Sequence, residues 1–233
     1  MVSNISRGDF LLKVIALSSL AFFKRCSIFG RPLIYFIGDS LTKGVGTSSK
    51  EFSFPYQAVG LLKNIDFEVF GYPGLSASEY YSQYIQNLII DSKRDTIAVV
   101  FFGANDLTEF PTDQVYNDIV KIHQFLRNRG VKSIVVPVMN RVDKYAIQPD
   151  FDKRRLELNK RLRANFRSFT SGIVDVNTAS EIYSSTAPNN ENYFNRKDND
   201  NLSGVHLTDR GASILGKAVA EQIMLLVPDS KAS

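Results

Sequence analysis

The sequence predicts an α/β fold in which one parallel sheet is covered by helices on both faces. Five short apolar runs, which are typical of buried strands, alternate with longer segments whose apolar residues recur every three or four positions. Strands that alternate with helices in this way form parallel sheets. A chain of 233 residues with 44% hydrophobic and 22% charged residues is sufficient for one globular domain with a full core.

The five predicted strands differ in how clearly the sequence marks them. Residues 33–37 are five consecutive apolar residues after a proline, a composition that suits a strand covered on both faces. Residues 97–102 form the clearest run. The other three predicted strands are residues 67–70, 133–138 and 173–176.

Five helices are predicted between and after the strands, at residues 54–63, 78–90, 112–129, 149–169 and 212–227. In the third, apolar residues lie three or four positions apart, which is the spacing of one buried helix face: Val115, Ile119, Ile122 and Leu126. The least structured stretch is expected at residues 184–202, which are rich in Asn and Asp.

We expect the domain to span residues 33–228, between an apolar N-terminal segment, residues 1–32, and a tail, residues 229–233. Residues 10–23 are apolar except for one lysine and two serines. As a helix they would extend about 21 Å, short of the roughly 30 Å hydrocarbon core of a membrane.

Three interpretations of this N-terminal segment stay open. It is an uncleaved anchor or interfacial helix whose Lys24 and Arg25 face lipid headgroups, a secretory signal, or an extra helix packed on the domain. A membrane surface is therefore a candidate partner through residues 10–25. Membrane-associated, secreted and cytoplasmic locations are all left open, as is the oligomeric state.

Charge and cysteine content exclude several classes of function. The net charge is +4, but lysines and arginines are spread along the chain, whereas a nucleic-acid-binding protein more often carries a basic stripe interleaved with aromatic residues. The single cysteine, Cys26, excludes an intrachain disulfide and a multi-cysteine metal site. Residues 43–46 (KGVG) fit neither of the glycine-rich motifs that bind phosphates or dinucleotides. We expect no nucleic-acid partner.

Three polar or small residues follow the first three predicted strands: Ser40, Gly74 and Asn105. The carboxyl ends of parallel strands lie along one edge of a sheet, and neighbouring strands are about 4.8 Å apart. If the first strand lies between the other two, a hydroxyl, a bare backbone amide and a carboxamide meet there. Fixed N–H donors near a serine suit acyl transfer, although a serine at a strand end also caps helices.

A serine nucleophile needs a base, and the chain has only two histidines. His206 lies after the fifth predicted strand and before the last helix, where a loop can return it to the sheet edge. His123 lies inside the third predicted helix, and we expect it to be a surface or partly packed residue.

Four short motifs, in this order, resemble the sequence blocks of the GDSL-type, or SGNH, serine hydrolases. They are GDSL at residues 38–41, PGLS at residues 73–76, GAND at residues 103–106 and GVHL at residues 204–207. Residues 101–106 and the chain length look most like the small isoamyl acetate-hydrolysing esterases of that family.

The resemblance implies a flavodoxin-like three-layer sandwich with strand order 2-1-3-4-5. It also implies that Ser40 is the nucleophile, that His206 is the base, and that Ser40, Gly74 and Asn105 form the oxyanion hole. No metal or organic cofactor is expected. The implied activity is hydrolysis of carboxylic esters through an acyl-enzyme, as in esterases and lipases, with a small ester, a lipid or an acetylated sugar as substrate.

One position departs from the family pattern. The family usually has an aspartate three residues before the histidine, and this chain has Ser203. Either Asp200 or Asp198 replaces the missing acid, or a serine–histidine dyad operates with Ser203 or a backbone carbonyl as the orienting group, or the protein is a catalytically weak or inactive ligand-binding protein. Asp39 and Asp106, beside two of the candidate site residues, are expected to accept backbone hydrogen bonds.

Overall fold

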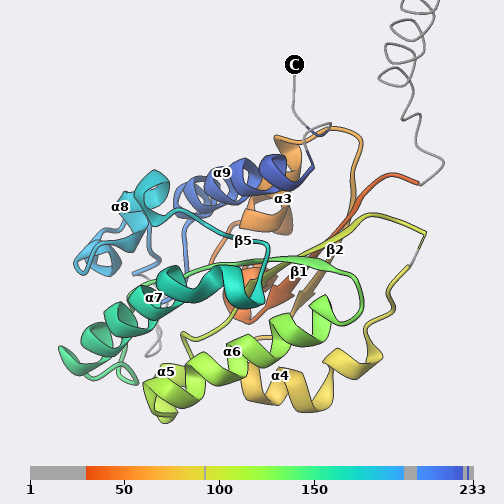
Figure 1. Ribbon diagram of the computed structural model, residues 1–233. Helices are drawn as coiled ribbons and strands as arrows, with labels where there is room; N and C mark the ends of the chain where they lie inside the picture. Colours follow the sequence, from red (N-terminus) through yellow and green to blue (C-terminus); the bar gives the residue numbers. More distant parts are fainter. Residues whose placement is uncertain (1–29, 92, 197–203, 228–229, 231–233) are drawn as a thin grey trace, which may run out of the picture.

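A five-stranded, fully parallel sheet forms the middle layer of the protein, and its strand order is β2-β1-β3-β4-β5. The structure is a computed structural model that describes residues 30–91, 93–196, 204–227 and 230. Helices cover both faces of the sheet (Figure 1). The predicted fold class and strand order are therefore confirmed. Most of the predicted N-terminal segment and tail, including residues 10–25, lies outside the described residues.

All five predicted strands are present: β1 Leu33–Gly38, β2 Asp66–Gly71, β3 Thr96–Phe101, β4 Lys132–Val135 and β5 Gly172–Ile173. The last two are shorter than predicted. The β4 ladder ends early because the Asn159 side chain accepts from the Val138 N–H at 2.8 Å and donates to the Val138 carbonyl oxygen at 2.7 Å. A helix side chain thus replaces the neighbouring strand as the partner of this backbone.

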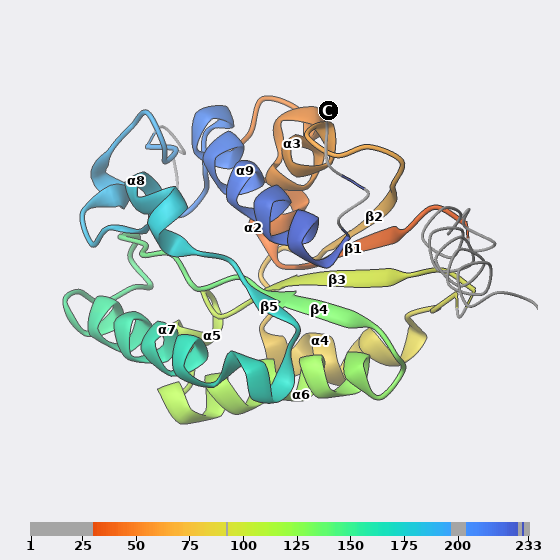
Figure 2. The same cartoon turned by 45° about the horizontal axis from the view of Figure 1, so that its top comes forward.

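Two of the longer helices pack on one face of the sheet and three on the other (Figure 2). The first pair is α3, Phe54–Gly60, and α9, Asp209–Leu226. The second group is α4, Ala77–Gln83, α6, Thr112–Arg127, and α7, Asp150–Phe169. All five correspond to predicted helices. The helix predicted at residues 78–90 is divided into α4 and a 3₁₀ turn, η2, Ile85–Asn87, and the ends of the other four differ from the prediction by up to three residues.

Short helical turns at several loops were not predicted, because three or four residues are too few to show a periodic pattern. The α-helical turns are α2, Ser40–Lys43, α5, Asp106–Glu109, and α8, Ser180–Tyr183. The 3₁₀ turns are η1, Lys50–Phe52, η3, Val176–Ala179, and η4, Ala187–Asn189. Among the helices that the structure describes, none combines the length and apolar character needed to cross a membrane.

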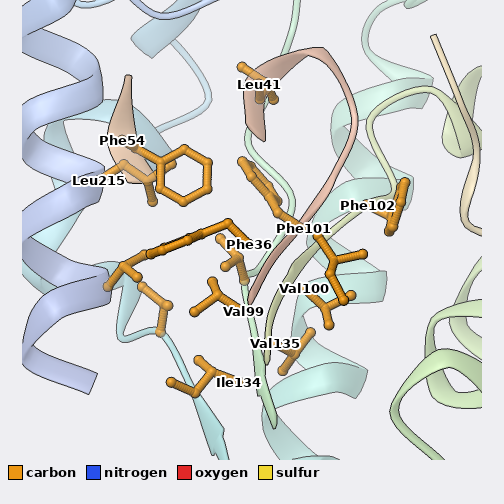
Figure 3. Packing of buried hydrophobic residues seen from close by; sticks show 14 of the residues in the cluster. Phe36, Leu41, Phe54, Val99, Val100, Phe101, Phe102, Ile134, Val135 and Leu215 are labelled. Carbon is orange, nitrogen blue, oxygen red and sulfur yellow. The ribbon is translucent and has the colours of Figure 1, made fainter. Parts of the chain in front are cut away.

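The core between the sheet and the α3–α9 layer is aromatic (Figure 3). Phe54 of α3 lies with its ring edge-on to Phe36 of β1 and to Phe101 of β3, and both pairs of ring centroids are 5.9 Å apart. Leu215 of α9 is fully buried beside them. These contacts fix the central strands, whose carboxyl ends carry the candidate site.

His123 is fully buried, so the prediction that it is a surface or partly packed residue is wrong. It lies four residues after Ile119, on the same face of α6, where it packs with its ring centroid 5.4 Å from that of Phe169. Its Nδ1 atom is 2.7 Å from the Ser133 hydroxyl oxygen on β4. Burial lowers the pKa of His123 to about 3, so the imidazole is neutral at ordinary pH.

The burial of His123 predicts a specific loss of stability in acid. Below about pH 6.5 the unfolded chain binds a proton at this residue, and the folded protein does not until about pH 3. The free energy of unfolding therefore falls with falling pH, by about 3 kcal/mol at pH 4 from this group. Urea unfolding of wild type and His123→Leu at pH 7 and pH 4 measures the contribution: the stability difference between the two should shift by this amount in favour of the variant.

Phe169→Leu is the matched control, because it weakens the same packing without removing a titrating group. Its stability difference from wild type should stay the same at both pH values. A wild-type minus His123→Leu difference that is equally independent of pH would contradict the prediction.

Candidate active site

Ser40 lies two residues beyond the end of β1, at the carboxyl edge of the sheet. Between them, the buried Asp39 side chain accepts a hydrogen bond from the Leu41 N–H at 2.9 Å and caps α2. Gly38 permits the sharp turn, because a Cβ atom there would lie 2.2 Å from Oγ1 of Thr42. The Ser40 N–H belongs to the first turn of α2, where backbone donors have no partner within the helix.

His206 reaches the same point from a position 166 residues further along the chain. Its Nε2 atom lies 3.0 Å from Oγ of Ser40, which is a hydrogen-bonding distance. His206 is only 4% exposed, so this contact is largely shielded from water. Of the two histidines, only this one lies beside the candidate nucleophile.

The backbone around His206 is held by a neighbouring segment. The Asn195 N–H donates to the His206 carbonyl oxygen at 2.8 Å, and the Thr208 N–H donates to the carbonyl oxygen of Tyr193 at 2.9 Å. Thr208 then caps α9 by accepting from the Gly211 N–H at 3.2 Å. Part of the stretch that was expected to be least structured, residues 184–202, therefore supports the histidine; residues 197–203 lie outside the described part of the chain.

The loop after α2 packs directly against His206. Gly46 has a left-handed φ of +94°, and a Cβ atom at this position would lie 2.6 Å from the Cβ of His206. The loop is fastened to the start of α9 because the backbone N–H and the hydroxyl of Ser48 donate to the Asp209 carboxylate at 2.8 and 2.6 Å. The chain around Ser40 and the chain around His206 thus meet at two places.

The Asn105 carboxamide, in the loop after β3, contacts the loops that follow β1, β2 and β4. Its Nδ2 atom is 3.2 Å from the Leu75 carbonyl oxygen and 3.5 Å from Oδ2 of Asp39. Its Oδ1 atom accepts a hydrogen bond from Nη1 of Arg141 at 3.2 Å. The amide nitrogen of Asn105 therefore faces Asp39, the residue that precedes Ser40.

Gly74 lies in the turn after β2 with a left-handed φ of +84°. A Cβ atom there would have no neighbour within 4 Å, so the turn is open at this point. Within residues 30–91, 93–196, 204–227 and 230, no backbone acceptor pairs with its N–H. The turn therefore offers a free backbone donor at the sheet edge.

Two buried carboxyl groups brace these loops. Asp106 accepts from the Ala77 N–H at 2.7 Å and from the Gly103 N–H at 3.0 Å, which joins the loop after β2 to the loop after β3. Burial raises the pKa of Asp106 to about 6 and that of Asp39 to about 7. Both carboxyl groups accept backbone hydrogen bonds, as expected from the sequence.

Arg141 and Asp143 were missed in the sequence, although both are buried at the site. They form a two-pronged ion pair, with Nε to Oδ1 at 2.5 Å and Nη2 to Oδ2 at 2.6 Å. Residues 136–149 have no helical or strand periodicity that predicts where these side chains point. The sequence signal is limited to two opposite charges two residues apart, in a stretch whose other charged residue is Lys144.

The three candidates for the group that orients His206, namely Ser203, Asp200 and Asp198, lie outside the described residues. Their roles stay predictions. In the described part of the chain there is no cluster of three or more His, Cys, Asp or Glu residues suited to a metal ion.

A family model for GDSL-like lipases and acylhydrolases matches residues 36–214, a span that contains all four motifs. The chain belongs to the GDSL-like lipase/acylhydrolase family. Membership of this family points to a hydrolase. No curated protein matches the sequence.

Several solved structures have the same fold. A lipolytic protein of the G-D-S-L family from Veillonella parvula is similar with a TM-score of 0.62 and 19% identity, over 82% of this chain and 97% of that one. A GDSL-like lipase from Bacteroides thetaiotaomicron matches with a TM-score of 0.61 and 16% identity, over 90% and 95% of the two chains. The psychrotrophic esterase EstA from a Pseudoalteromonas species matches with a TM-score of 0.58 and 13% identity, over 84% and 98%.

The close packing of Gly46 against His206 predicts that Gly46→Ala lowers activity of the hydrolase. The added methyl group overlaps the histidine, and a displacement of about 1 Å at a reacting group can cost about 10²-fold in rate. We expect kcat of the hydrolase to fall at least about 10-fold. Gly130→Ala is the matched control, because Gly130 also has a left-handed φ, +75°, but a Cβ there meets nothing within 4 Å.

Both variants should lose about 1–2 kcal/mol of stability from the unfavourable backbone conformation, measured by urea unfolding. Only Gly46→Ala should lose activity beyond the small effect of that destabilisation. Equal kcat values for the two variants would show that the contact with His206 does not matter for turnover.

Proposed function

We propose that the protein hydrolyses carboxylic esters through a covalent acyl-serine intermediate. The observation that carries the proposal is the 3.0 Å distance between Oγ of Ser40 and Nε2 of His206 at the carboxyl edge of a parallel sheet. A serine hydroxyl is a weak nucleophile near neutral pH, and an imidazole at hydrogen-bonding distance is the usual means of activating it.

In the proposed reaction, Ser40 Oγ bonds to the ester carbonyl carbon as its proton passes to Nε2 of His206. The tetrahedral intermediate collapses when the carbon–oxygen bond to the alcohol breaks and His206 returns the proton to the leaving oxygen. Water then attacks the acyl-serine with His206 again taking a proton, and the acid is released as Ser40 regains its hydrogen. The sum is ester plus water giving acid plus alcohol.

Three N–H donors are proposed to stabilise the negative charge that develops on the carbonyl oxygen: the backbone amides of Ser40 and Gly74 and the Asn105 carboxamide. The described contacts support this assignment, since the Ser40 amide opens α2, the Gly74 amide has no backbone acceptor among the described residues, and the Asn105 nitrogen lies beside the same turn. Loss of one such donor typically costs about 3–4 kcal/mol in the transition state.

The alternative, a catalytically weak or inactive ligand-binding protein, rests only on Ser203 in place of an aspartate. Family membership and the close approach of His206 to Ser40 favour turnover instead. We propose that His206 is oriented either by Ser203 or a backbone carbonyl, or by Asp200 or Asp198.

A fluorophosphonate probe should label Ser40 and no other serine in the native protein. Ser40→Ala should abolish labelling and lower the hydrolysis of p-nitrophenyl acetate at least ~10³-fold, because the acyl-enzyme can no longer form. Ser82→Ala, which changes an exposed serine on α4, is the matched control and should keep both. A folded Ser40→Ala protein that still hydrolysed the ester at the original rate would exclude the proposal.

The substrate class is proposed to be a small ester, with a lipid or an acetylated sugar as the other candidates. The resemblance of residues 101–106 to isoamyl acetate-hydrolysing esterases favours short acyl chains. We therefore expect kcat/KM for p-nitrophenyl esters to be highest for acetate and to fall with each longer acyl chain, and isoamyl acetate to be hydrolysed. A kcat/KM that rises toward long acyl chains would indicate a lipase-like substrate instead.

A further inference from the structure

We propose that Arg141 is a positioning residue of the oxyanion hole, which holds the Asn105 carboxamide with its nitrogen facing the reaction. This inference rests on the proposed function for its catalytic consequence. The arrangement of Arg141 around Asn105 is a property of the fold.

A carboxamide is nearly symmetrical in shape, with an oxygen that accepts hydrogen bonds and a nitrogen that donates them. Only one of its two orientations presents a donor to a developing oxyanion. If Asn105 rotated by half a turn about its last side-chain bond, it would present an oxygen to that negative charge. The site therefore needs a device that distinguishes the two ends.

Arg141 is that device, because a guanidinium carries donors and no acceptor. Its Nη1 atom donates to Oδ1 of Asn105 at 3.2 Å, and a rotated carboxamide would place two donors against each other there. On the opposite side the Leu75 carbonyl oxygen, which can only accept, receives Nδ2 at 3.2 Å. The two contacts select the same orientation.

The guanidinium is itself fixed in position. Asp143 accepts from Nε and Nη2 at 2.5 and 2.6 Å, and both residues are buried, at 4% and 7% exposed. Nη1 also donates to the carbonyl oxygen of Ala104 at 3.1 Å, so a single nitrogen contacts the backbone before Asn105 and the side chain of Asn105 itself. The Arg141 carbonyl oxygen accepts from Nε2 of Gln148 at 2.6 Å.

Stability alone does not explain this pair. Removing two charges from water costs free energy that their attraction often does not recover, and apolar residues of similar size are frequently as stable. In this ion pair Asp143 binds Nε and Nη2 of Arg141, and Nη1 donates to Asn105, a candidate oxyanion-hole residue. This arrangement fits a positioning role. A positive group on the amide oxygen also polarises the carboxamide and strengthens its N–H as a donor.

Arg155 provides a matched control on the same side of the sheet. It is also a buried arginine, at 2% exposed, and pairs with a nearby aspartate, Asp152, at 2.7 Å. It donates to the carbonyl oxygens of Val138, in the segment after β4, and of Tyr183, in α8, at 3.5 and 3.3 Å. Its contacts join backbone segments and do not include Asn105.

The test is a double-mutant cycle with p-nitrophenyl acetate, using Arg141→Met, Asn105→Ala and the double variant, with Arg155→Met as control. We expect Arg141→Met to lower kcat roughly 10- to 100-fold, somewhat less than the ~10²- to 10³-fold typical of losing the donor itself. KM should change less than about 3-fold, because the contact acts on the transition state. In the Asn105→Ala background, Arg141→Met should cause no further loss.

Arg155→Met should keep kcat within about 2-fold of wild type once folding is accounted for by urea unfolding. Independent, multiplicative losses for Arg141→Met and Asn105→Ala would overturn the proposal, and so would an unchanged kcat in Arg141→Met. If Arg141→Met does not fold, Asp143→Asn, which loosens the guanidinium without removing it, replaces it in the same cycle. A smaller loss that again vanishes without Asn105 supports the proposal, and no loss overturns it.

A second readout does not depend on turnover. The side-chain amide resonances of Asn105, assigned by their absence in Asn105→Ala, should shift or broaden in Arg141→Met and stay in place in Arg155→Met. If the wild-type protein hydrolyses no ester and the fluorophosphonate leaves Ser40 unlabelled, the proposed function fails, and these resonances still decide whether Arg141 fixes the carboxamide. Unchanged resonances in Arg141→Met would overturn the positioning role.

Discussion

The hydrogen bond between Ser40 and His206 joins two segments that are 166 residues apart, and it depends on the surrounding fold to hold both segments in place. Closing so long a segment of chain costs conformational entropy, which one hydrogen bond cannot offset. The sheet offsets it, because β1 is paired on both sides over its full length and is buried between helix layers. At the other end, α9 packs on the same face of the sheet as α3 (Figure 2). His206, three residues before α9, therefore lies at the edge where β1 ends, with Nε2 at 3.0 Å from Oγ of Ser40.

The parts of this architecture that were predictable are those that the local sequence determines. Continuous apolar runs identified β1 and β3, and the parallel topology then placed Ser40 and Asn105 at the carboxyl edge of the sheet. The parts that were missed depend on side chains from distant segments. The early end of β4 depends on Asn159 of α7, and the burial of His123 depends on its contacts with Ser133 of β4 and Phe169 of α7. The position of Arg141 follows from irregular backbone, whose course no periodicity reveals.

Burial raises the pKa of two carboxyl groups at the site, Asp39 and Asp106. Desolvation raises the pKa of Asp39 to about 7 and that of Asp106 to about 6, even though backbone N–H groups donate to both. Their contribution to stability relative to the unfolded chain is largest in acid and is lost as the pH rises through these values. Asp143 faces a guanidinium at close range instead. At this site, ionisable groups are buried where they hold loops, although their burial is unfavourable for the charged form. Such groups are common at functional sites.

The side chains of Asp39, Asp106 and Arg141 hold the loops that follow the first four strands. The Asp39 side chain caps the turn that follows β1, and Asp106 ties the loop after β2 to the loop after β3. Arg141 then ties the loop after β3 to the loop after β4. Held in this way, the proposed oxyanion-hole donors are oriented before a substrate arrives, so under our proposal the cost of ordering them falls on folding and is absent from the reaction. The type of each group follows from what it holds. Asp39 and Asp106 bind backbone N–H groups, which need an acceptor. Arg141 binds a carbonyl oxygen and a carboxamide oxygen, which need a donor.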